Sequence, residues 1–449
     1  MQKIDEAVRT GAALALWGAL LLVTYWWVAD GGVSALGTGG GSLALGLGQL
    51  LGLGASVLLL AQVVLMARVP VLERAFGQDR LAVLHRIVGF TSFNLMLAHV
   101  VLVTWGYAAG SLSALPGMLW DLTWDYPGML LADAGGLCLV MVVVTSVRTA
   151  RRRLRYESWH LMHLYAYLGV GLALPHQLWT GQQFTASPGR TLFWWTAWAV
   201  AAAAVLGWRV AVPVATNLRH QLRVAAVVPE APGTWSVHVT GRRLERLRAE
   251  PGQFFLWRFL GAPGRSRAHP YSLSAAPDGR SLRITVAAAG DDSALVGGLR
   301  PGTRVLVEGP YGRLSPRART APRVALIGAG VGVTPLRALL EGLPYGPGDA
   351  VYLERYRDAP LFPAEVDAIA RQRGAQVVRL PGPRRAADSW FPVLGRPVDD
   401  VTALRGWVPD IAERDVYVCG PDPWARLVRA SLSSAGVADS RIHIESFAW

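Results

Sequence analysis

Long apolar runs fill the first half of the chain and constrain its fold more than any other feature. Each run approaches the length of about 20 residues that a helix needs to cross the hydrocarbon core of a bilayer. We expect membrane-spanning helices at about residues 10–29, 43–67, 82–105, 128–147, 159–179 and 191–212. The whole chain is 52% hydrophobic and only 17% charged, whereas soluble domains carry about 25% charged residues. This composition argues against an ordinary soluble enzyme.

Basic residues are unevenly distributed among the connections between these runs. They occur in residues 1–9, 68–81 and 148–158, whereas residues 30–42 and 106–127 contain neither Lys nor Arg. The positive-inside rule assigns basic connections to the cytoplasmic side. We therefore expect a multi-pass protein of the plasma (inner) membrane with both termini in the cytoplasm. Basic connections beside the lipid bilayer, the expected partner, then explain the net charge of +13. The charge does not imply that the protein binds nucleic acid.

The pattern changes at about residue 218, where short alternating runs separated by Gly and Pro turns begin. The runs at 235–240, 281–286 and 304–308 predict a small antiparallel β-barrel. After about residue 320, strands alternate with helical stretches, which is typical of a parallel sheet. We predict a multi-domain membrane protein with a six-helix transmembrane bundle at 1–215, a β-barrel domain at 216–318 and an α/β domain at 319–449.

Four histidines occupy matched depths in two of the expected spans. His85 and His99 lie 14 residues apart, about 21 Å along a helix and within about 40° of one face. His163 and His176 lie 13 residues apart, and a straight helix would separate them by about 140°, although Pro175 can rotate the helix end. Since both spans run outward, His85 would face His163 and His99 would face His176. Two stacked imidazole pairs are typical of two six-coordinate haems.

A simpler interpretation of these histidines exists. Intramembrane histidines also form hydrogen bonds between helices without binding a cofactor. Four of them at matched depths on two parallel spans favour haem ligation, and a dinuclear metal site would need carboxylates or more closely grouped histidines.

The predicted barrel contains a run suited to a flavin. An aromatic ring and small hydroxyls on an extended strand can cover a flavin face and bind its edge, and they occur here at His269, Pro270, Tyr271, Ser272 and Ser274. Downstream, the segment from Gly290 to Ser293 can begin a helix whose free N–H groups receive a pyrophosphate, and a tight turn follows at 308–312. Each feature alone is also typical of a surface turn; their order favours a flavin site.

The predicted α/β domain contains two candidate nicotinamide motifs. Glycines that let the backbone approach a pyrophosphate follow a strand and precede a helix, in a run that comprises Gly328, Gly330, Gly332, Thr334 and Pro335. A second strand ends at Cys419, Gly420 and Pro421, which would place a small thiol beside a nicotinamide ring. Arg355 and Arg357 follow another strand, where a 2′-phosphate would lie, and favour NADPH slightly over NADH.

These motifs together resemble a known family combination. The first half resembles the ferric reductase-like transmembrane domain of NADPH oxidases and metalloreductases, and the second half resembles flavin dehydrogenases of the ferredoxin–NADP reductase type. The resemblance covers nearly the whole chain. It implies that His85, His99, His163 and His176 bind two b-type haems, that residues 269–274 bind FAD, and that residues 328–335 and 419–421 bind NAD(P)H. It also implies that a late aromatic residue covers the flavin, with Trp449 slightly preferred over Phe447.

The sequence therefore predicts a transmembrane oxidoreductase. Electrons would pass from cytosolic NAD(P)H through FAD and two haems to an acceptor outside, either a ferric chelate or oxygen, which would give superoxide. Alternatively, the protein would donate its electrons to a periplasmic or extracellular protein. The sequence identifies no such protein partner. A channel with a redox-sensing flavin domain and a haem-free membrane-anchored flavoprotein remain the competing classes.

Overall fold

The computed structural model describes residues 2–37, 39–147, 151, 156–261, 267–288, 293, 295–393 and 398–446. The chain divides into two compact units, Met1–Ala211 and Val212–Trp449. The predicted boundary between the barrel and the α/β domain, at residues 318 and 319, falls inside the second unit and stays a prediction.

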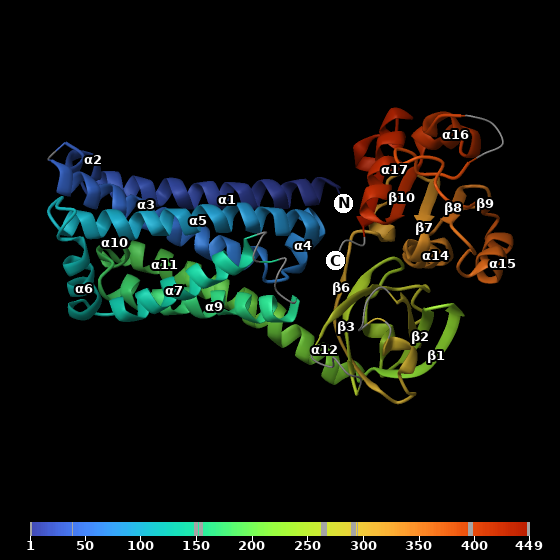
Figure 1. The fold of residues 1–449 in the computed structure, drawn as a ribbon, viewed down its shortest axis with the longest axis horizontal. Helices are drawn as coiled ribbons and strands as arrows, with labels where there is room; N and C mark the ends of the chain where they lie inside the picture. Colours follow the sequence, from blue (N-terminus) through green and yellow to red (C-terminus); the bar gives the residue numbers. More distant parts are fainter. Residues whose placement is uncertain are drawn as a thin grey trace. The chain divides into compact units, whose positions relative to one another are not determined.

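The first unit is helical in the part that the structure describes (Figure 1). Its α-helices are α1 (Gln2–Ala29), α2 (Gly32–Ala35), α3 (Gly40–Leu65), α4 (Pro70–Phe76), α5 (Gln78–Tyr107), α6 (Leu115–Asp125), α7 (Met129–Ser146), α9 (Tyr156–Trp179), α10 (Gln182–Thr185) and α11 (Pro188–Ala204). A π-helical segment, Val205–Ala211, follows α11 and continues into α12 (Val212–His220) at the start of the second unit.

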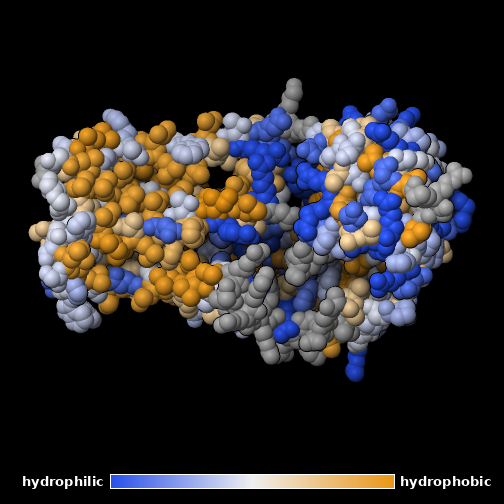
Figure 2. All heavy atoms as spheres, turned by 45° about the horizontal axis from the view of Figure 1, so that its top comes forward, coloured by the Kyte–Doolittle hydropathy of each residue, from blue (hydrophilic) through white to orange (hydrophobic). Residues whose placement is uncertain are grey.

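Among the described residues, five helical segments are long and apolar enough to cross a membrane. They are Ile4–Ala29, Gly40–Leu65, Arg80–Tyr107, Met129–Ser146 and Pro188–His220, and they overlap five of the six expected spans. The remaining expected span, 159–179, lies in the 24-residue helix α9, which is not one of the five. Histidines, tyrosines and a Pro–His–Gln run interrupt its apolar sequence. Figure 2 shows hydrophobic residues over most of the visible face of the helical unit.

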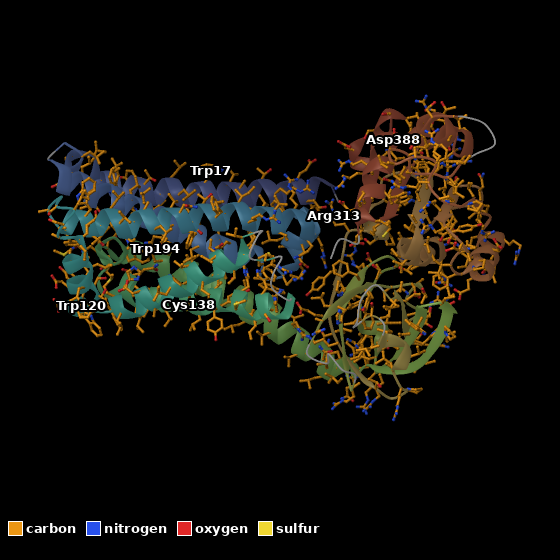
Figure 3. The ribbon with its side chains drawn as sticks, in the orientation of Figure 1. Trp17, Trp120, Cys138, Trp194, Arg313 and Asp388 are labelled. Atoms are coloured by element: carbon orange, nitrogen blue, oxygen red, sulfur yellow. The ribbon has the colours of Figure 1, made fainter. Side chains whose placement is uncertain are left out.

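Two tryptophans show the difference between the interior and the surface of this unit (Figure 3). Trp194 of α11 is 1% exposed, and its ring stacks on Phe184 with the ring centroids 4.0 Å apart. Trp17 of α1 is 64% exposed. In water such an exposed indole would be unfavourable, but a helix that spans a membrane presents apolar side chains to lipid.

The helices pack most extensively as two pairs, α3 with α5 and α7 with α9. Glycines let the second pair approach closely. A Cβ atom at Gly135 would lie 2.7 Å from the carbonyl oxygen of Gly169, and one at Gly169 would lie 2.9 Å from the carbonyl oxygen of Gly135. Small residues at such contacts are the usual means by which membrane helices pack backbone against backbone.

The second unit begins with a six-stranded antiparallel sheet. Its strands are β1 (Arg223–Ala231), β2 (Thr234–Thr240), β3 (Phe254–Leu260), β4 (His269–Ser272), β5 (Ser281–Ala287) and β6 (Arg304–Tyr311), in the order β4-β3-β6-β1-β2-β5. An isolated β-bridge joins Leu273, which follows β4, to Ile284 of β5. Alternate side chains fill the interior, where Val237, Phe255 and Trp257 are fully buried.

The rest of the second unit is a five-stranded parallel sheet, as predicted for this region. Its strands are β7 (Val324–Ala329), β8 (Ala350–Tyr356), β9 (Gln376–Pro381), β10 (Asp415–Gly420) and β11 (Ile442–Ser446), in the order β11-β10-β7-β8-β9. The cores place α14 (Val333–Gly342) and α15 (Pro363–Arg373) on one face, and α16 (Asp400–Trp407) and α17 (Asp422–Ser434) on the other. Since both faces are covered, every residue of β7 and β10 is buried.

The strand order fixes where a ligand can approach this sheet. The chain passes from the central strand β7 to β8 on one side, and later returns to β10 on the other side. Open parallel sheets bind ligands in the crevice beyond the carboxyl ends of the strands at such a reversal. The ends of β7 and β10 are therefore the expected nicotinamide position.

Candidate functional site

The first unit brings the four candidate histidines together in two pairs. His85 and His99 lie on α5, and His163 and His176 lie on α9. The imidazole rings of His85 and His163 face each other with centroids 6.1 Å apart and planes at 67°. His99 and His176 lie close enough to interact electrostatically. The pairing is the one expected from matched depths, although α9 contains Pro175 within the helix.

Helix α3 orients both histidines of α5. His85 Nδ1 lies 3.3 Å from the carbonyl oxygen of Gln62, and His99 Nδ1 lies 2.8 Å from the carbonyl oxygen of Gly48. A carbonyl oxygen only accepts hydrogen bonds, so in each contact Nδ1 carries the proton. In a neutral imidazole with that tautomer, the Nε2 lone pair is free to bind a metal.

The histidines of α9 differ in their surroundings. His163 Nδ1 lies 3.3 Å from Ser146 Oγ, which also accepts a hydrogen bond of 3.2 Å from Trp159 Nε1. The ring of Trp159 lies 5.0 Å from that of His163. His176 Nδ1 is buried and makes no hydrogen bond of good geometry among the described residues, although the backbone of Ala173 interacts with the ring.

A glycine on α3 makes room for the His99 ring. A Cβ atom at Gly52 would lie 2.5 Å from His99 Nδ1 and 2.8 Å from Cε1, closer than non-bonded atoms approach. No other residue type fits here without moving the imidazole. Within the described residues no group of three or more His, Cys, Asp or Glu side chains could hold a metal ion.

The candidate flavin motif lies on β4, which pairs with β3. The register places His269 opposite Trp257 and Tyr271 opposite Phe255. Trp257 Nε1 donates a 2.9 Å hydrogen bond to the carbonyl oxygen of Tyr271, and the rings of His269 and Tyr271 stack with centroids 6.0 Å apart. Both rings and Pro270 are half-buried.

The two serines of this motif are more deeply buried than its rings. Ser272 is 4% exposed and Ser274 is fully buried. Ser274 Oγ accepts hydrogen bonds from Thr285 Oγ1 at 2.8 Å and from Arg283 Nε at 3.2 Å. Ser274 therefore contributes to any cofactor binding by positioning the side chains of Thr285 and Arg283. Among the other predicted residues, Ser293 is described and half-buried, whereas Gly290, Phe447 and Trp449 lie outside the described residues.

The glycine-rich loop lies between a strand and a helix, as its sequence predicts. It joins β7 to α14 through a 3-10 turn, Gly330–Gly332. Gly330 has a φ of +56° and no atom within 4 Å of an added Cβ, whereas a Cβ at Gly332 would lie 2.3 Å from the carbonyl oxygen of Cys419. Gly332 thus allows the start of α14 to contact the end of β10, whereas the space beside Gly330 is open.

The other residues of the motif stabilise this loop. Thr334 is 2% exposed, and its hydroxyl donates a 2.9 Å hydrogen bond to the carbonyl oxygen of Val331. Pro335 is buried in the first turn of α14, and Gly328, at the end of β7, would place a Cβ 2.8 Å from the side chain of Leu336. These residues shape the turn at the start of α14.

Cys419 lies at the end of β10, in register with Gly328 of β7 and Glu445 of β11. It is fully buried, and burial, with a smaller contribution from Glu445, raises the pKa of its thiol well above the ordinary value. The thiol is therefore protonated at neutral pH and is not a nucleophile. Gly420 would place a Cβ 2.7 Å from the ring of Trp424, and Pro421 precedes the first residue of α17.

Arg355 and Arg357 extend from the carboxyl end of β8. Arg355 is in register with Ala329 of β7 and donates a 3.1 Å hydrogen bond from Nη2 to the carbonyl oxygen of Gly382. Burial lowers the pKa of Arg355, and the nearby charges of Arg384 and Arg357 lower it further. Arg384 follows β9 and was not among the residues that the sequence indicated. The three guanidinium groups form a cationic edge next to the glycine-rich loop.

Glu354, beside this edge, is a further residue that the sequence did not indicate. It is 1% exposed, and its Oε1 accepts a 3.0 Å hydrogen bond from the backbone N–H of Leu361. Its Oε2 is buried with no hydrogen-bond partner among the described residues. Burial raises the pKa of Glu354 to about 7. The sequence does not indicate that a glutamate at the end of a predicted strand will be buried.

Comparison with known proteins gives separate matches for the two halves. Residues 51–174 match the family described as "Ferric reductase like transmembrane component"; this segment includes His85, His99 and His163. "Stachydrine N-demethylase reductase subunit Stc4" of Rhizobium meliloti is 31% identical over 239 residues, which cover 49% of this chain and 64% of that protein.

Two further matches have similar coverage of this chain. The "3-ketosteroid-9-alpha-monooxygenase, ferredoxin reductase component" of Mycolicibacterium smegmatis is 31% identical over 51% of this chain and 65% of its own length. The crystal structure of the "Flavohem-like-FAD/NAD Binding Domain of Nitric Oxide Dioxygenase" from Vibrio cholerae is 25% identical and covers 51% of this chain and 98% of its own, with a TM-score of 0.41.

The chain thus spans somewhat less than two thirds of the length of the first two relatives. The family match lies in the helical unit, and the homology to reductases lies in the C-terminal half. This chain carries a ferric reductase-like transmembrane domain followed by a homologue of the ferredoxin reductase-type FAD- and NAD-binding domains.

Proposed function

We propose that this protein transfers electrons across a membrane from NAD(P)H to an acceptor on the opposite side. Bound FAD would accept hydride from NAD(P)H, and two b-type haems would carry single electrons through the membrane. The observation that carries the proposal is the facing pair of imidazoles on α5 and α9, whose centroids lie 6.1 Å apart.

That separation fits axial ligation of one iron. A metal–imidazole nitrogen distance of about 2 Å on each side, with about 1 Å from each nitrogen to its ring centre, places two axial rings about 6 Å apart. The Nδ1 contacts of His85 and His99 with α3 leave Nε2 free for the metal. A haem supplies four nitrogens itself and needs only two protein ligands, so the absence of larger ligand groups among the described residues is compatible with it.

The residues would then have defined roles. His85 and His163 would hold the inner haem, and His99 and His176 would hold the outer haem. In the second unit, the half-buried rings of His269 and Tyr271 would lie against FAD. The loop at 328–335 and the end of β10 at 419–421 would orient NAD(P)H, with Arg355 and Arg357 close to a 2′-phosphate.

The proposal includes a six-span arrangement in the plasma membrane, with α9 as the fifth span and both termini in the cytoplasm. The basic connections at 68–81 and 148–158, compared with those at 30–42 and 106–127, which contain neither Lys nor Arg, support this orientation. In such an arrangement α5 and α9 run in the same direction, which matches the pairing of His85 with His163 and of His99 with His176.

The acceptor outside would be a ferric chelate or oxygen, with superoxide as the product in the second case. Two axial imidazoles leave no open position on the iron, so either acceptor would be reduced by outer-sphere transfer. A protein acceptor is the second candidate, because the relatives are named as a reductase subunit and a ferredoxin reductase component.

A reduced-minus-oxidised spectrum of the purified, flavin-loaded chain tests the proposal. We expect about two b-type haems per chain, and about one in either double variant, His85→Ala with His163→Ala or His99→Ala with His176→Ala. His238→Ala, in the barrel strand β2, is the control and should retain both haems. A flavin-loaded protein with no Soret absorption would contradict the proposal and leave a haem-free membrane flavoprotein.

A further inference from the structure

A group of four charged side chains connects the two sheets of the second unit. Arg283 lies on β5 of the antiparallel sheet, Arg337 and Glu341 lie on α14, and Glu365 lies on α15. None of these residues belongs to a motif that the sequence indicated. We call Arg283, Arg337, Glu341 and Glu365 the intersheet clamp.

The centre of the clamp is a bidentate ion pair. Arg283 Nη1 and Nη2 donate to Glu365 Oε1 and Oε2, each at 2.9 Å. Arg337 Nη2 lies 2.8 Å from the same Oε2 atom. Both arginine side chains are only 8% exposed. Burial opposes ionisation of Glu365, but the hydrogen bonds and charges of the two arginines lower its pKa, so the carboxylate is ionised at neutral pH.

A second connection runs parallel to the first. Arg337 Nη1 donates to Glu341 Oε2, and the backbone N–H of Ala276 donates a 2.7 Å hydrogen bond to the same oxygen. Ala276 follows the candidate flavin motif by two residues. Close packing supports this connection, because a Cβ atom at Gly342 would lie 2.2 Å from the ring of Pro251 and 3.1 Å from Ala276 Cβ.

Each end of the clamp is attached to a candidate binding motif. Arg283 Nη2 donates a 2.9 Å hydrogen bond to the carbonyl oxygen of Ser274, and Arg283 Nε donates to Ser274 Oγ. On the other side, Arg337 lies one turn into α14, whose first residue, Val333, directly follows the turn Gly330–Gly332. A continuous path of hydrogen bonds therefore joins the end of the flavin motif to the helix that begins at the nicotinamide motif.

We propose that the intersheet clamp is a positioning device that holds the nicotinamide motif at the correct distance from the flavin motif for hydride transfer. This inference rests on the proposed function. Hydride passes from the nicotinamide C4 to the flavin N5 only when these two atoms are in close, aligned contact, and a displacement of about 1 Å can cost about 100-fold in rate. A bidentate guanidinium–carboxylate pair fixes distance and angle together, which a single ammonium contact does not do.

The test is single-turnover reduction of the flavin by NAD(P)H in the full-length, FAD-loaded protein under anaerobic conditions. Glu365→Gln retains the shape of the side chain and removes its charge, Arg283→Lys retains charge without the fork, and Arg283→Met removes both. We expect flavin reduction at saturating NAD(P)H to slow by about 10- to 100-fold in Glu365→Gln and Arg283→Met, with Arg283→Lys between these and the unchanged protein. The dissociation constant for NAD(P)H and the FAD content should change by less than about threefold.

Asp367→Asn is the matched control. Asp367 lies on α15 two residues after Glu365, and its ion pair is with Arg379 of β9, inside the parallel sheet. This variant loses an ion pair from the same helix but none between the sheets, so its rate of flavin reduction should equal that of the unchanged protein.

Two results would overturn the inference. One is a rate of flavin reduction in Glu365→Gln within twofold of the unchanged protein; the other is a loss in Glu365→Gln that appears only in the dissociation constant. Failure of the unchanged protein to bind FAD or to oxidise NAD(P)H would instead refute the proposed function, so the two failures are distinguishable.

Discussion

The carbonyl oxygen of Gly48 on α3 accepts a 2.8 Å hydrogen bond from His99 Nδ1 on α5. This contact fixes the tautomer and the direction of an imidazole inside a helical bundle. It depends on a close approach of α3 to the ring, which glycine at position 52 permits. The orientation of one candidate haem ligand thus depends on a neighbouring helix that contributes no ligand.

The first prediction follows from this approach. In Gly52→Ala, the new methyl group would lie 2.5 Å from His99 Nδ1, so the ring must move and the outer haem should be lost or under-occupied. We expect the haem content to fall from about two towards one per chain, measured by haem extraction and absorbance. Gly54→Ala, on the same helix, meets its nearest atom at 3.7 Å and should retain full haem content; equal haem in both variants would contradict the argument.

The second prediction concerns Ser146, which contacts His163 Nδ1 at 3.3 Å and accepts from Trp159 Nε1. Loss of the acceptor in Ser146→Ala makes the imidazole a weaker donor to the metal, which destabilises the oxidised iron. We expect the reduction potential of one haem to rise by roughly tens of millivolts, measured by a redox titration followed spectroscopically. Thr145→Val, whose wild-type hydroxyl bonds only to backbone carbonyls of its own helix, should leave both potentials unchanged. A shift of equal size in the two variants would count against a specific role for Ser146.

The third prediction concerns pH and Glu354. Burial raises the pKa of this carboxyl from 4.5 to about 7 in the folded protein, so between those values the folded state binds more protons than the unfolded state. The free energy of unfolding should therefore decrease as the pH rises from about 4.5 to about 7, by at most about 3 kcal/mol. Glu354→Gln should remove this decrease and be the more stable protein at pH 8.

Thermal unfolding of the second unit, followed by flavin release at several pH values, measures this effect. Asp388→Asn is the control, because it removes the same charge from an exposed residue on the loop after β9 (Figure 3). Parallel pH profiles of the Glu354→Gln and unchanged proteins would show that Glu354 does not cause the dependence.

The fourth prediction concerns the cationic edge formed by Arg355, Arg357 and Arg384. If a 2′-phosphate binds there, Arg355→Ala and Arg384→Ala each remove a charge-assisted interaction of about 1.5–3 kcal/mol. The KM for NADPH should then rise by about 10- to 100-fold, while the KM for NADH changes little. Steady-state kinetics with both nucleotides measure this ratio, and Arg371→Ala on α15 is the control. An equal effect on NADH and NADPH would place the 2′-phosphate elsewhere.

Local sequence patterns predicted most of the helices and the parallel sheet. Apolar runs indicated helices because a segment in lipid must satisfy its own backbone hydrogen bonds, and the glycine-rich loop was recognisable because Gly330 and Gly332 meet conformational needs within one short turn. Helix α9 was the exception among the spans, since the histidines that gave it a candidate function also reduced its apolar character.

Contacts between distant segments could not be predicted. Arg283 and Glu365 are 82 residues apart. In the sequence, neither residue can be distinguished from an ordinary charged surface residue. The burial of Glu354 and the placement of Arg384 beside Arg355 likewise depend on how strands and loops assemble. The pairing of His85 with His163 could be predicted only because both lie on regular helices, where spacing along the sequence determines the position along the helix axis.

The state of the two cysteines has a practical consequence. Cys419 is fully buried with a raised thiol pKa, and Cys138 lies within the apolar helix α7 (Figure 3). A membrane-impermeant maleimide needs an exposed thiolate in water, so the natural chain should remain unlabelled. A single cysteine introduced at Ser111 or at Arg74 would therefore report, without further engineering, which connection faces which aqueous compartment.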